Sequence, residues 1–353
     1  MNPETEKIIK VYEEPDTIEL MIIEDGSAFA EKVAAADLVE LPFKLPLASL
    51  GEFVQHLVGP TERFGAERPY ADLSAKDGSR VHIIVSPLTR GGPVLTIRKR
   101  PTSRPSLQEI IDNGSIPAKC AEFLKFATAN KQNLLIVGGT SSGKTTLLNA
   151  LAALSPAQDR ILVLEDTPEL VLPQKHVIYL KTRMRDPRGQ PDITLRDLLV
   201  NSLRMRPDRI VVGECRGAEA FDMLSAMNVG HDGVMATIHS NSAREALARL
   251  ETLCLMSGVD FPLKALRQNI VQALDLIVFM TRLPNGVRTV AQVTEVTGID
   301  QDVVTLSDLF KLTSHRDAQG TCIRLMPTGS MPRFYDLLRH QGVEPPIAFF
   351  QED

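Results

Sequence analysis

Residues 133–146 read NLLIVGGTSSGKTT. Four consecutive apolar residues lead into a glycine-rich loop, Gly138–Thr145, which satisfies the pattern GxxxxGK[ST] and opens a helix-prone segment. In such a loop the backbone N–H groups turn inward around phosphate oxygens, and the N-terminus of the helix adds positive potential. A chance glycine-rich turn is the alternative, but the strand before the loop and the helix after it disfavour it. The stretch therefore predicts a phosphate-binding site at the end of a strand.

Each residue of this loop has an expected part in binding ATP. We expect Lys144 to reach the β- and γ-phosphates and the Thr145 hydroxyl to ligate Mg²⁺. The other residues supply backbone donors or space for the phosphates to approach closely. They are Gly138, Gly139, Thr140, Ser141, Ser142, Gly143 and Thr146.

Short apolar segments alternate with helix-prone segments around the loop. The expected strands are 133–137, 160–164, 209–213, 233–239 and 275–280. The expected helices are 144–154, 195–204, 218–227, 242–256 and 262–274. This alternation builds a largely parallel sheet flanked by helices. The predicted fold class is therefore α/β, a P-loop domain preceded by a small α+β domain.

Changes in composition suggest how the chain is divided. Residues 11–100 contain short alternating runs separated by turn signals, which indicate a small α+β domain. The stretch from Arg98 to Pro117 combines prolines with the cations Arg98, Lys99, Arg100 and Arg104, a composition that breaks regular structure and carries positive charge. We therefore predict an N-terminal domain over 1–100, a basic linker over 101–117 and an ATPase domain with a C-terminal extension over 118–353. In the tail 311–353 we expect turns and one short helical run near 334–338.

Acidic residues follow two of the expected strands. Glu165 and Asp166 come directly after one, and Glu214 comes after another. Ligands of open α/β folds bind at the carboxyl edge of the sheet, where both glutamates should emerge. One would support Mg²⁺, and the other would orient the attacking water. Taken singly, each is more often a solvated loop residue, but the phosphate loop upstream favours the functional interpretation.

Histidines and arginines complete the candidate site. His231 and His239 are expected near the same edge, where a neutral imidazole could donate a hydrogen bond to the γ-phosphate. A metal site is not indicated, because no third ligand is suitably spaced. Arginine offers a planar fork for phosphate oxygens, and the residues near the linker are the better candidates, against a background of ordinary surface charge. The arginines considered are Arg80, Arg98, Arg100, Arg204 and Arg216.

Composition and residue spacing disfavour several functional classes. The net charge is −5, tryptophan is absent and aromatic residues make up 5%, which disfavours a nucleic-acid translocase that stacks bases. The four cysteines are widely spaced, so neither a zinc knuckle nor a disulfide scaffold is expected and a reducing cytoplasm fits best. No apolar run approaches the roughly 18 residues of a membrane span, so membrane association is expected to go through a partner.

Several motifs together resemble those of a known family. LRMRPDRIVVGE (203–214) is similar to an atypical Walker B box, GAEAFDMLSAMNVGHDGVMATIH (217–239) to a histidine box, and Glu165-Asp166 to an aspartate box. With the phosphate loop they resemble the secretion and pilus ATPases of type II and type IV systems. The segments RPYADLSAKDGSRV, GPVLTIRKR, TEVTGIDQDVVTLSDLF and MPRFYDLL are most similar to the Tad/Flp pilus assembly ATPase of the CpaF type.

This resemblance implies that the P-loop domain is a RecA-like ATPase domain. It also implies a cytoplasmic hexameric ring, peripheral at the inner membrane, that uses ATP and Mg²⁺ to drive pilin movement at a platform protein. Glu165 would orient the water, with Glu214, Arg216 and His239 as further catalytic candidates. Two positions depart from the pattern. Ser141 replaces the usual glycine of the loop, and Thr167-Pro168 is more similar to conjugation ATPases.

Three other functions remain open on the sequence. The first is an ATPase of conjugation or of effector secretion, which genomic neighbours would separate from a pilus motor. The second is a nucleic-acid translocase, which a salt-dependent DNA titration would detect. The third is a nucleotide-binding regulator that switches without sustained turnover, which steady-state phosphate release would decide.

Overall fold

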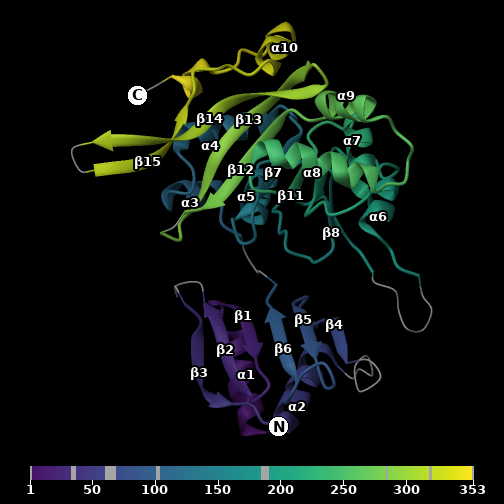
Figure 1. Cartoon of the computed structure of the whole chain (residues 1–353), viewed down its shortest axis with the longest axis vertical. Coiled ribbons are helices and arrows are strands. Elements are labelled where there is room, and N and C mark those ends of the chain that lie inside the picture. Colours follow the sequence, from purple (N-terminus) through teal and green to yellow (C-terminus); the bar gives the residue numbers. More distant parts are fainter. Residues whose placement is uncertain are drawn as a thin grey trace. The chain divides into compact units, whose positions relative to one another are not determined.

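The computed structural model describes residues 2–32, 37–59, 69–100, 104–183, 191–283, 285–317 and 320–351, apart from the side chains of 315–322. The chain divides into two units, Met1–Thr102 and Ser103–Asp353, which are described separately (Figure 1). The start of the predicted linker, 101–103, lies outside the described residues.

The first unit is an antiparallel sheet with two helices. Its strand order is β3-β2-β1-β6-β5-β4. The helices are α1 (Pro3–Glu13) and α2 (Leu47–Val58), and the strands are β1 (Thr17–Ile22), β2 (Ser27–Lys32), β3 (Val39–Lys44), β4 (Tyr70–Ser74), β5 (Arg80–Ile84) and β6 (Val94–Arg98). Apolar residues alternate along the strands, so Leu20, Ile22, Leu95 and Ile97 point to one face and form a core with the buried residues of both helices.

The second unit contains a nine-stranded sheet in the order β15-β14-β13-β12-β7-β11-β10-β8-β9. The run from β12 to β9 is parallel, and β13, β14 and β15 extend it as antiparallel strands. The strands are β7 (Leu134–Gly138), β8 (Ile161–Glu165), β9 (Val177–Lys181), β10 (Arg209–Val212), β11 (Met235–His239), β12 (Leu276–Arg282), β13 (Arg288–Asp300), β14 (Val303–Asp317) and β15 (Gly320–Pro327).

Helices cover both faces of this sheet (Figure 1). Leu134 and Ile136 of β7 pack toward α3 (Leu107–Asp112), α4 (Ala118–Ala129) and α5 (Lys144–Ala152). Leu135 and Val137 pack toward the other helices. These are α6 (Leu195–Ser202), α7 (Glu219–Asn228), α8 (Ala243–Leu255) and α9 (Leu263–Ala273). Burial on both faces explains why the central strands are continuous apolar runs.

The chain ends on the α3–α5 side of the sheet. Helix α10 (Phe334–His340) and the short 3₁₀ helix η1 (Ile347–Phe350) pack there against Phe123 and Phe310. Phe123 meets both Phe334 and Phe350 at ring-centroid distances of 6.3 and 5.2 Å. This aromatic cluster joins the C-terminal extension to the core of the unit.

The predicted fold class is confirmed, but four elements differ from expectation. The tail 311–353, in which turns and one short helix were expected, also contributes the end of β14 and the whole of β15. Strands β13 and β14 are joined at Gln301-Asp302, which both have positive φ and so form the mirror-image turn that suits a hairpin without the usual glycine. The predicted irregular linker contains α3, which begins with a capping box between Ser106 and Glu109. Strand β9 was not expected.

Two further expectations concern cysteines and membrane spans. Cys120, Cys215 and Cys254 are buried free thiols, and the side chain of Cys322 lies outside the described residues. Among the residues that the structure describes, none of the helices is both long and apolar enough to cross a bilayer.

Candidate nucleotide-binding site

The phosphate loop connects β7 to α5, as the sequence predicts. Lys144 is the first residue of α5, its side chain is buried, and its Nζ donates to the Gly139 carbonyl oxygen at 2.8 Å. Burial lowers the pKa of Lys144, and the nearby Glu214 carboxylate opposes this shift. Thr145 and Thr146 are half-buried in the first turn of the helix. A cation, a hydroxyl and the free amides of a helix N-terminus therefore meet at one place.

Close packing explains two features of the loop. A Cβ added at Gly138 would lie 2.5 Å from the Met280 carbonyl oxygen and 2.5 Å from Ser142 Oγ, so only glycine fits. The buried Ser142 Oγ has no hydrogen-bond partner among the described residues, which leaves a polar atom available to a ligand. Ser141 has φ +56°, the left-handed conformation that the usual glycine would adopt more easily.

Parallel pairing brings the candidate residues to the same edge of the sheet. The order β7-β11-β10-β8 places His239 beside Gly138, with Glu214 and then Glu165 farther along the carboxyl edge. Glu214 follows β10, which is two strands away from β7, and Glu165 ends β8, which is three strands away. Neighbouring strands in a sheet are about 4.8 Å apart.

Glu165 is held inside the turn that follows β8. Its side chain is buried, and Oε1 accepts hydrogen bonds from the backbone N–H groups of Glu169 and Leu170 at 2.8 and 2.9 Å. Burial raises the pKa of Glu165 to about 7, although the two backbone donors pull it down. A carboxyl group with a pKa near neutrality at this edge is suited to accept a proton.

Glu214 is the acid that most affects Lys144. Its Oε2 accepts from Arg216 Nη2 at 2.7 Å, and it is the largest of the charges that favour the protonated lysine. Glu219 holds the following turn, because its Oε1 accepts from the backbone N–H groups of Arg216 and Gly217 at 2.6 and 2.8 Å. Arg216 is exposed beside Glu214 and so remains able to reach a ligand.

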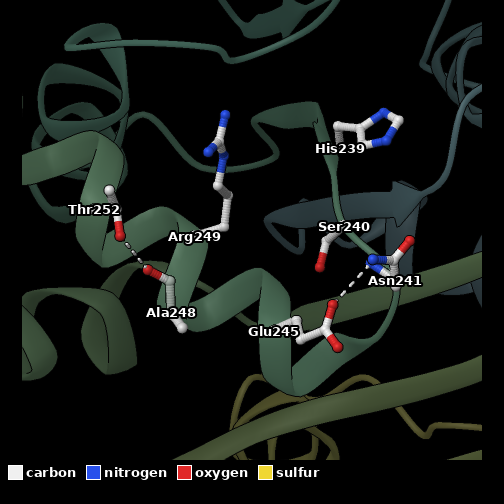
Figure 2. A pocket seen from close by; sticks show the side chains of 7 residues that line it. All are labelled: His239, Ser240, Asn241, Glu245, Ala248, Arg249 and Thr252. Carbon is white, nitrogen blue, oxygen red and sulfur yellow. Dashed lines mark hydrogen bonds between the residues drawn. The ribbon is translucent and has the colours of Figure 1, made fainter.

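An open pocket of about 490 Å³ adjoins the end of β11. Figure 2 shows His239, Ser240 and Asn241 from the strand end opposite Glu245, Arg249 and Thr252 of α8. The Asn241 backbone N–H donates to Glu245 Oε2 at 3.3 Å, which ties the strand end to the helix. The exposed side chain of His239 lies at the rim of this pocket, next to the phosphate loop.

The family described as "Type II/IV secretion system protein" matches residues 67–311, well over half of the chain. The chain belongs to this family. The probable conjugal transfer protein TrbB of Sinorhizobium fredii is 30% identical over 299 residues, which cover 82% of this chain and 86% of that protein. The X-ray structure of the Legionella pneumophila ATPase DotB matches with a TM-score of 0.60 at 23% identity, over 81% of this chain and 78% of that one, and shows the likeness of fold.

A third relative is longer than this chain. The uncharacterized protein MJ0781 of Methanocaldococcus jannaschii is 47% identical over 175 residues, which cover 48% of this chain. The aligned part is 24% of the length of that protein, so this chain matches about a quarter of it.

The oxygen ligands present in this type II/IV secretion protein fit Mg²⁺ that arrives with a nucleotide. Mg²⁺ is usually held by one or two carboxylates together with phosphate oxygens and water. The Thr145 hydroxyl and the Glu214 carboxylate lie at the same edge and supply the protein's share. In the described ranges no group of three or more His, Cys, Asp or Glu side chains could hold a metal ion.

The structure adds three residues to the neighbourhood of the loop that the sequence did not single out. Glu169 lies close enough to Lys144 for its charge to raise the lysine pKa, and it pairs with Arg104 at 3.2 Å. Arg288 of β13 lies beside Gly143, since a Cβ added there would be 3.7 Å from Arg288 Cδ. Glu169 could have been found by its position four residues after Glu165, whereas the two arginines required the long-range fold.

Two of the predicted site residues, His231 and Arg204, lie away from the phosphate loop. His231 precedes β11 and Arg204 precedes β10, so both lie toward the amino edge of the parallel strands, opposite the phosphate loop. The expectation that His231 and His239 share an edge is therefore wrong. The two histidines are only eight residues apart in the sequence, but β11 (Met235–His239) lies between them and carries the chain from one edge of the sheet to the other.

Three candidate arginines belong to the first unit. The exposed Arg98 has its Nε 3.8 Å from Glu19 Oε1, and Arg80 pairs with Asp72 at 3.2 Å. The Arg100 backbone N–H donates to Ser79 Oγ at 3.0 Å. Arg80 and Arg98 face each other across β5 and β6, so their guanidinium groups share one face of this sheet.

Proposed function

We propose that this chain is a Mg²⁺-dependent ATPase that powers assembly of a Tad/Flp-type pilus through an inner-membrane platform protein. The observation that carries the proposal is the phosphate loop with a buried Lys144, at the same sheet edge as Glu214 and Glu165. Membership in the type II/IV secretion family supports it. The pilus type rests on the resemblance of the segments quoted above.

Binding would exchange interactions within the protein for interactions with phosphate. Lys144 Nζ now donates to the Gly139 carbonyl oxygen, and it would turn to the β- and γ-phosphates. The low pKa of a buried lysine would return toward its usual value next to this negative charge. Backbone N–H groups of the loop and of the first turn of α5 would hold the remaining oxygens.

Hydrolysis would use the acids at the sheet edge. Mg²⁺, held by Thr145 and Glu214, would neutralise charge that develops on the phosphates. Glu165 would orient the attacking water and accept its proton. His239 would donate to the γ-phosphate, and Arg216 would stabilise charge in the transition state.

We further propose that the motor consists of several copies of this chain. We propose a cytoplasmic homohexameric ring in which Arg98 and Arg100 clamp phosphates when the nucleotide is bound. Because a mechanical output needs motion coupled between subunits, oligomerisation is part of the proposal. Particle symmetry by cryo-electron microscopy with an ATP analogue and Mg²⁺ should show six copies, and a monomer would contradict the ring.

The Lys144→Ala variant tests the site. We expect phosphate release under multiple turnover to be nearly abolished and ATP binding to weaken, because the main charge contact to the phosphates is lost. The thermal midpoint should stay within a few degrees of the unmodified chain, since the side chain makes one hydrogen bond to its own loop. Normal phosphate release by the variant would contradict the assignment.

A conjugation or effector-secretion ATPase is the second candidate. The likeness to TrbB over most of the chain and the Thr167-Pro168 step favour it. Both candidates hydrolyse ATP, so the enzyme assay does not separate them. Deletion of the gene followed by measurement of surface pili, of DNA transfer and of secreted protein would do so, because a pilus motor predicts the loss of pili alone, whereas the second candidate predicts the loss of DNA transfer or of protein secretion.

A further inference from the structure

The segment after β8 is fastened along the helix that carries the phosphate loop. Glu165 Oε1 closes its first turn by accepting from the amides of Glu169 and Leu170. The Val171 amide donates to Asn149 Oδ1 of α5 at 2.7 Å. Gln174 Nε2 donates to the Ser155 carbonyl oxygen at 2.9 Å, just beyond the end of that helix. We call residues 165–170 the acidic turn.

Arg104, which is 65 residues away from Glu169 in the sequence, forms hydrogen bonds with this turn. Its Nε donates to the Glu169 carbonyl oxygen at 2.9 Å, and its Nη2 lies 3.2 Å from Glu169 Oε2. One guanidinium group thus holds both the backbone and the side chain of a single residue. The two side chains are only 13% and 20% exposed, so water competes weakly for this contact.

The charge of Glu169, the residue that Arg104 holds, acts on two cations of the candidate site. Burial lowers the pKa of Lys144, and the negative charge of Glu169 is one of the charges that oppose this shift. The hydrogen bond with Glu214 is the main cause that raises the pKa of Arg216, and the charge of Glu169 adds to it. A shift of Glu169 would therefore change the electrostatic environment of both cations. It would also move the two amides to which the Glu165 carboxylate is bonded.

We propose that Arg104 is a positioning residue for hydrolysis, because its guanidinium fork holds Glu169 and thereby the whole acidic turn beside the phosphate loop. This inference rests on the proposed ATPase function. Arg104 is the second residue of the unit Ser103–Asp353, so the contact ties the beginning of this unit to its candidate catalytic edge. Lysine at this position could not make both contacts in the same geometry, since it lacks the planar fork.

The test compares Arg104→Ala and Arg104→Lys with a matched control. Arg267 of α9 also forms a partly buried pair, with Nε 2.7 Å from Glu251 Oε1 and Nη1 donating to the Asp302 carbonyl oxygen. It lies among the helices of the other sheet face, so Arg267→Ala removes a similar contact outside the acidic turn. Each variant is assayed for kcat, for the Kd of a fluorescent ATP analogue and for thermal stability.

We expect Arg104→Ala to lower kcat by about 10- to 100-fold, as for a reacting group displaced by about 1 Å, with less than a twofold change in Kd. Arg104→Lys should recover part of the loss, and Arg267→Ala should keep kcat within about twofold. An unchanged kcat in Arg104→Ala, or an equal loss in the Arg267→Ala control, would overturn the inference.

Hydrogen exchange separates failure of this inference from failure of the proposed function. The amides of Glu169 and Leu170 should exchange at least tenfold faster in Arg104→Ala, and at the original rate in Arg267→Ala. If the unmodified chain does not hydrolyse ATP, the ATPase proposal fails and the catalytic role assigned to Arg104 fails with it. Unchanged exchange at both amides, in a chain that does hydrolyse ATP, rejects the positioning role alone.

Discussion

Gly138 and Gly139 are neighbours in the phosphate loop, yet only one of them is confined by its surroundings. A Cβ at Gly138 would lie 2.5 Å from two oxygen atoms, whereas a Cβ at Gly139 would have no neighbour within 4 Å. The same substitution therefore has different expected costs at two adjacent positions.

We predict that Gly138→Ala lowers the free energy of unfolding by roughly 1–3 kcal/mol, the usual cost of overpacking. Gly139→Ala is the matched control and should change it by less than about 1 kcal/mol. Urea denaturation without nucleotide measures both values. Equal losses in the two variants would show that the loop does not require close approach at Gly138.

The two acids at the sheet edge should respond differently to loss of charge. Glu165→Gln keeps an oxygen that accepts from the amides of the acidic turn, so we expect ATP to bind while hydrolysis falls by roughly 10²–10⁴. Glu214→Gln should raise the Mg²⁺ requirement, because a metal-supporting carboxylate is lost. Nucleotide affinity with and without Mg²⁺, and single-turnover hydrolysis, measure these effects. If Glu165→Gln turns over normally while Glu214→Gln binds Mg²⁺ and ATP without hydrolysis, the roles must be exchanged.

At the scale of elements, the end of β8 and the acidic turn bury the carboxyl group of Glu165. This burial makes the free energy of unfolding depend on pH. The folded-state pKa of Glu165 is about 7, above its ordinary value of 4.5. Below about pH 4.5 the Glu165 carboxyl group is protonated in both the folded and the unfolded chain, so its burial does not make the free energy of unfolding depend on pH. Between about pH 4.5 and 7 the unfolded chain releases the proton and the folded chain retains it, so stability falls as pH rises.

We therefore predict that the unmodified chain loses up to about 3 kcal/mol of stability relative to Glu165→Gln as pH rises from about 4.5 to 7. Urea denaturation at several pH values measures this difference. Glu295, with a pKa raised to about 7, and Asp275, with a pKa raised to about 6, contribute equally to both proteins and cancel. A constant difference between the two proteins across this pH range would contradict a buried, protonated Glu165.

At the scale of the whole molecule, the arginines of the first unit test whether both units take part in turnover. Arg98 is well exposed, and its Nε lies 3.8 Å from Glu19 Oε1. Arg98→Ala and Arg100→Ala should lower kcat more than they weaken nucleotide binding, if these residues contact phosphates mainly in the transition state. Lys44→Ala is the control, because Lys44 is an exposed cation of the same unit that pairs with Asp25. Full activity in both arginine variants would reject the clamp.

Local patterns in the sequence were sufficient to predict those helices, strands and loops whose structure depends on residues close together in the chain. A strand, a glycine-rich loop and a helix N-terminus within fourteen residues, 133–146, predicted β7, the loop and α5. The expected strands and helices of the parallel sheet were found for the same reason, because burial on both faces makes each strand a short apolar run.

Only the tertiary structure decided which of these pieces meet. Pairing of β7 with β11 brought His239 to Gly138 and sent His231 to the opposite edge, although the two histidines are eight residues apart. The contact between Arg104 and Glu169 spans 65 residues and leaves no local pattern. Such contacts depend on strand order and on the packing of side chains that are distant in sequence, and neither is encoded in the spacing of one short segment.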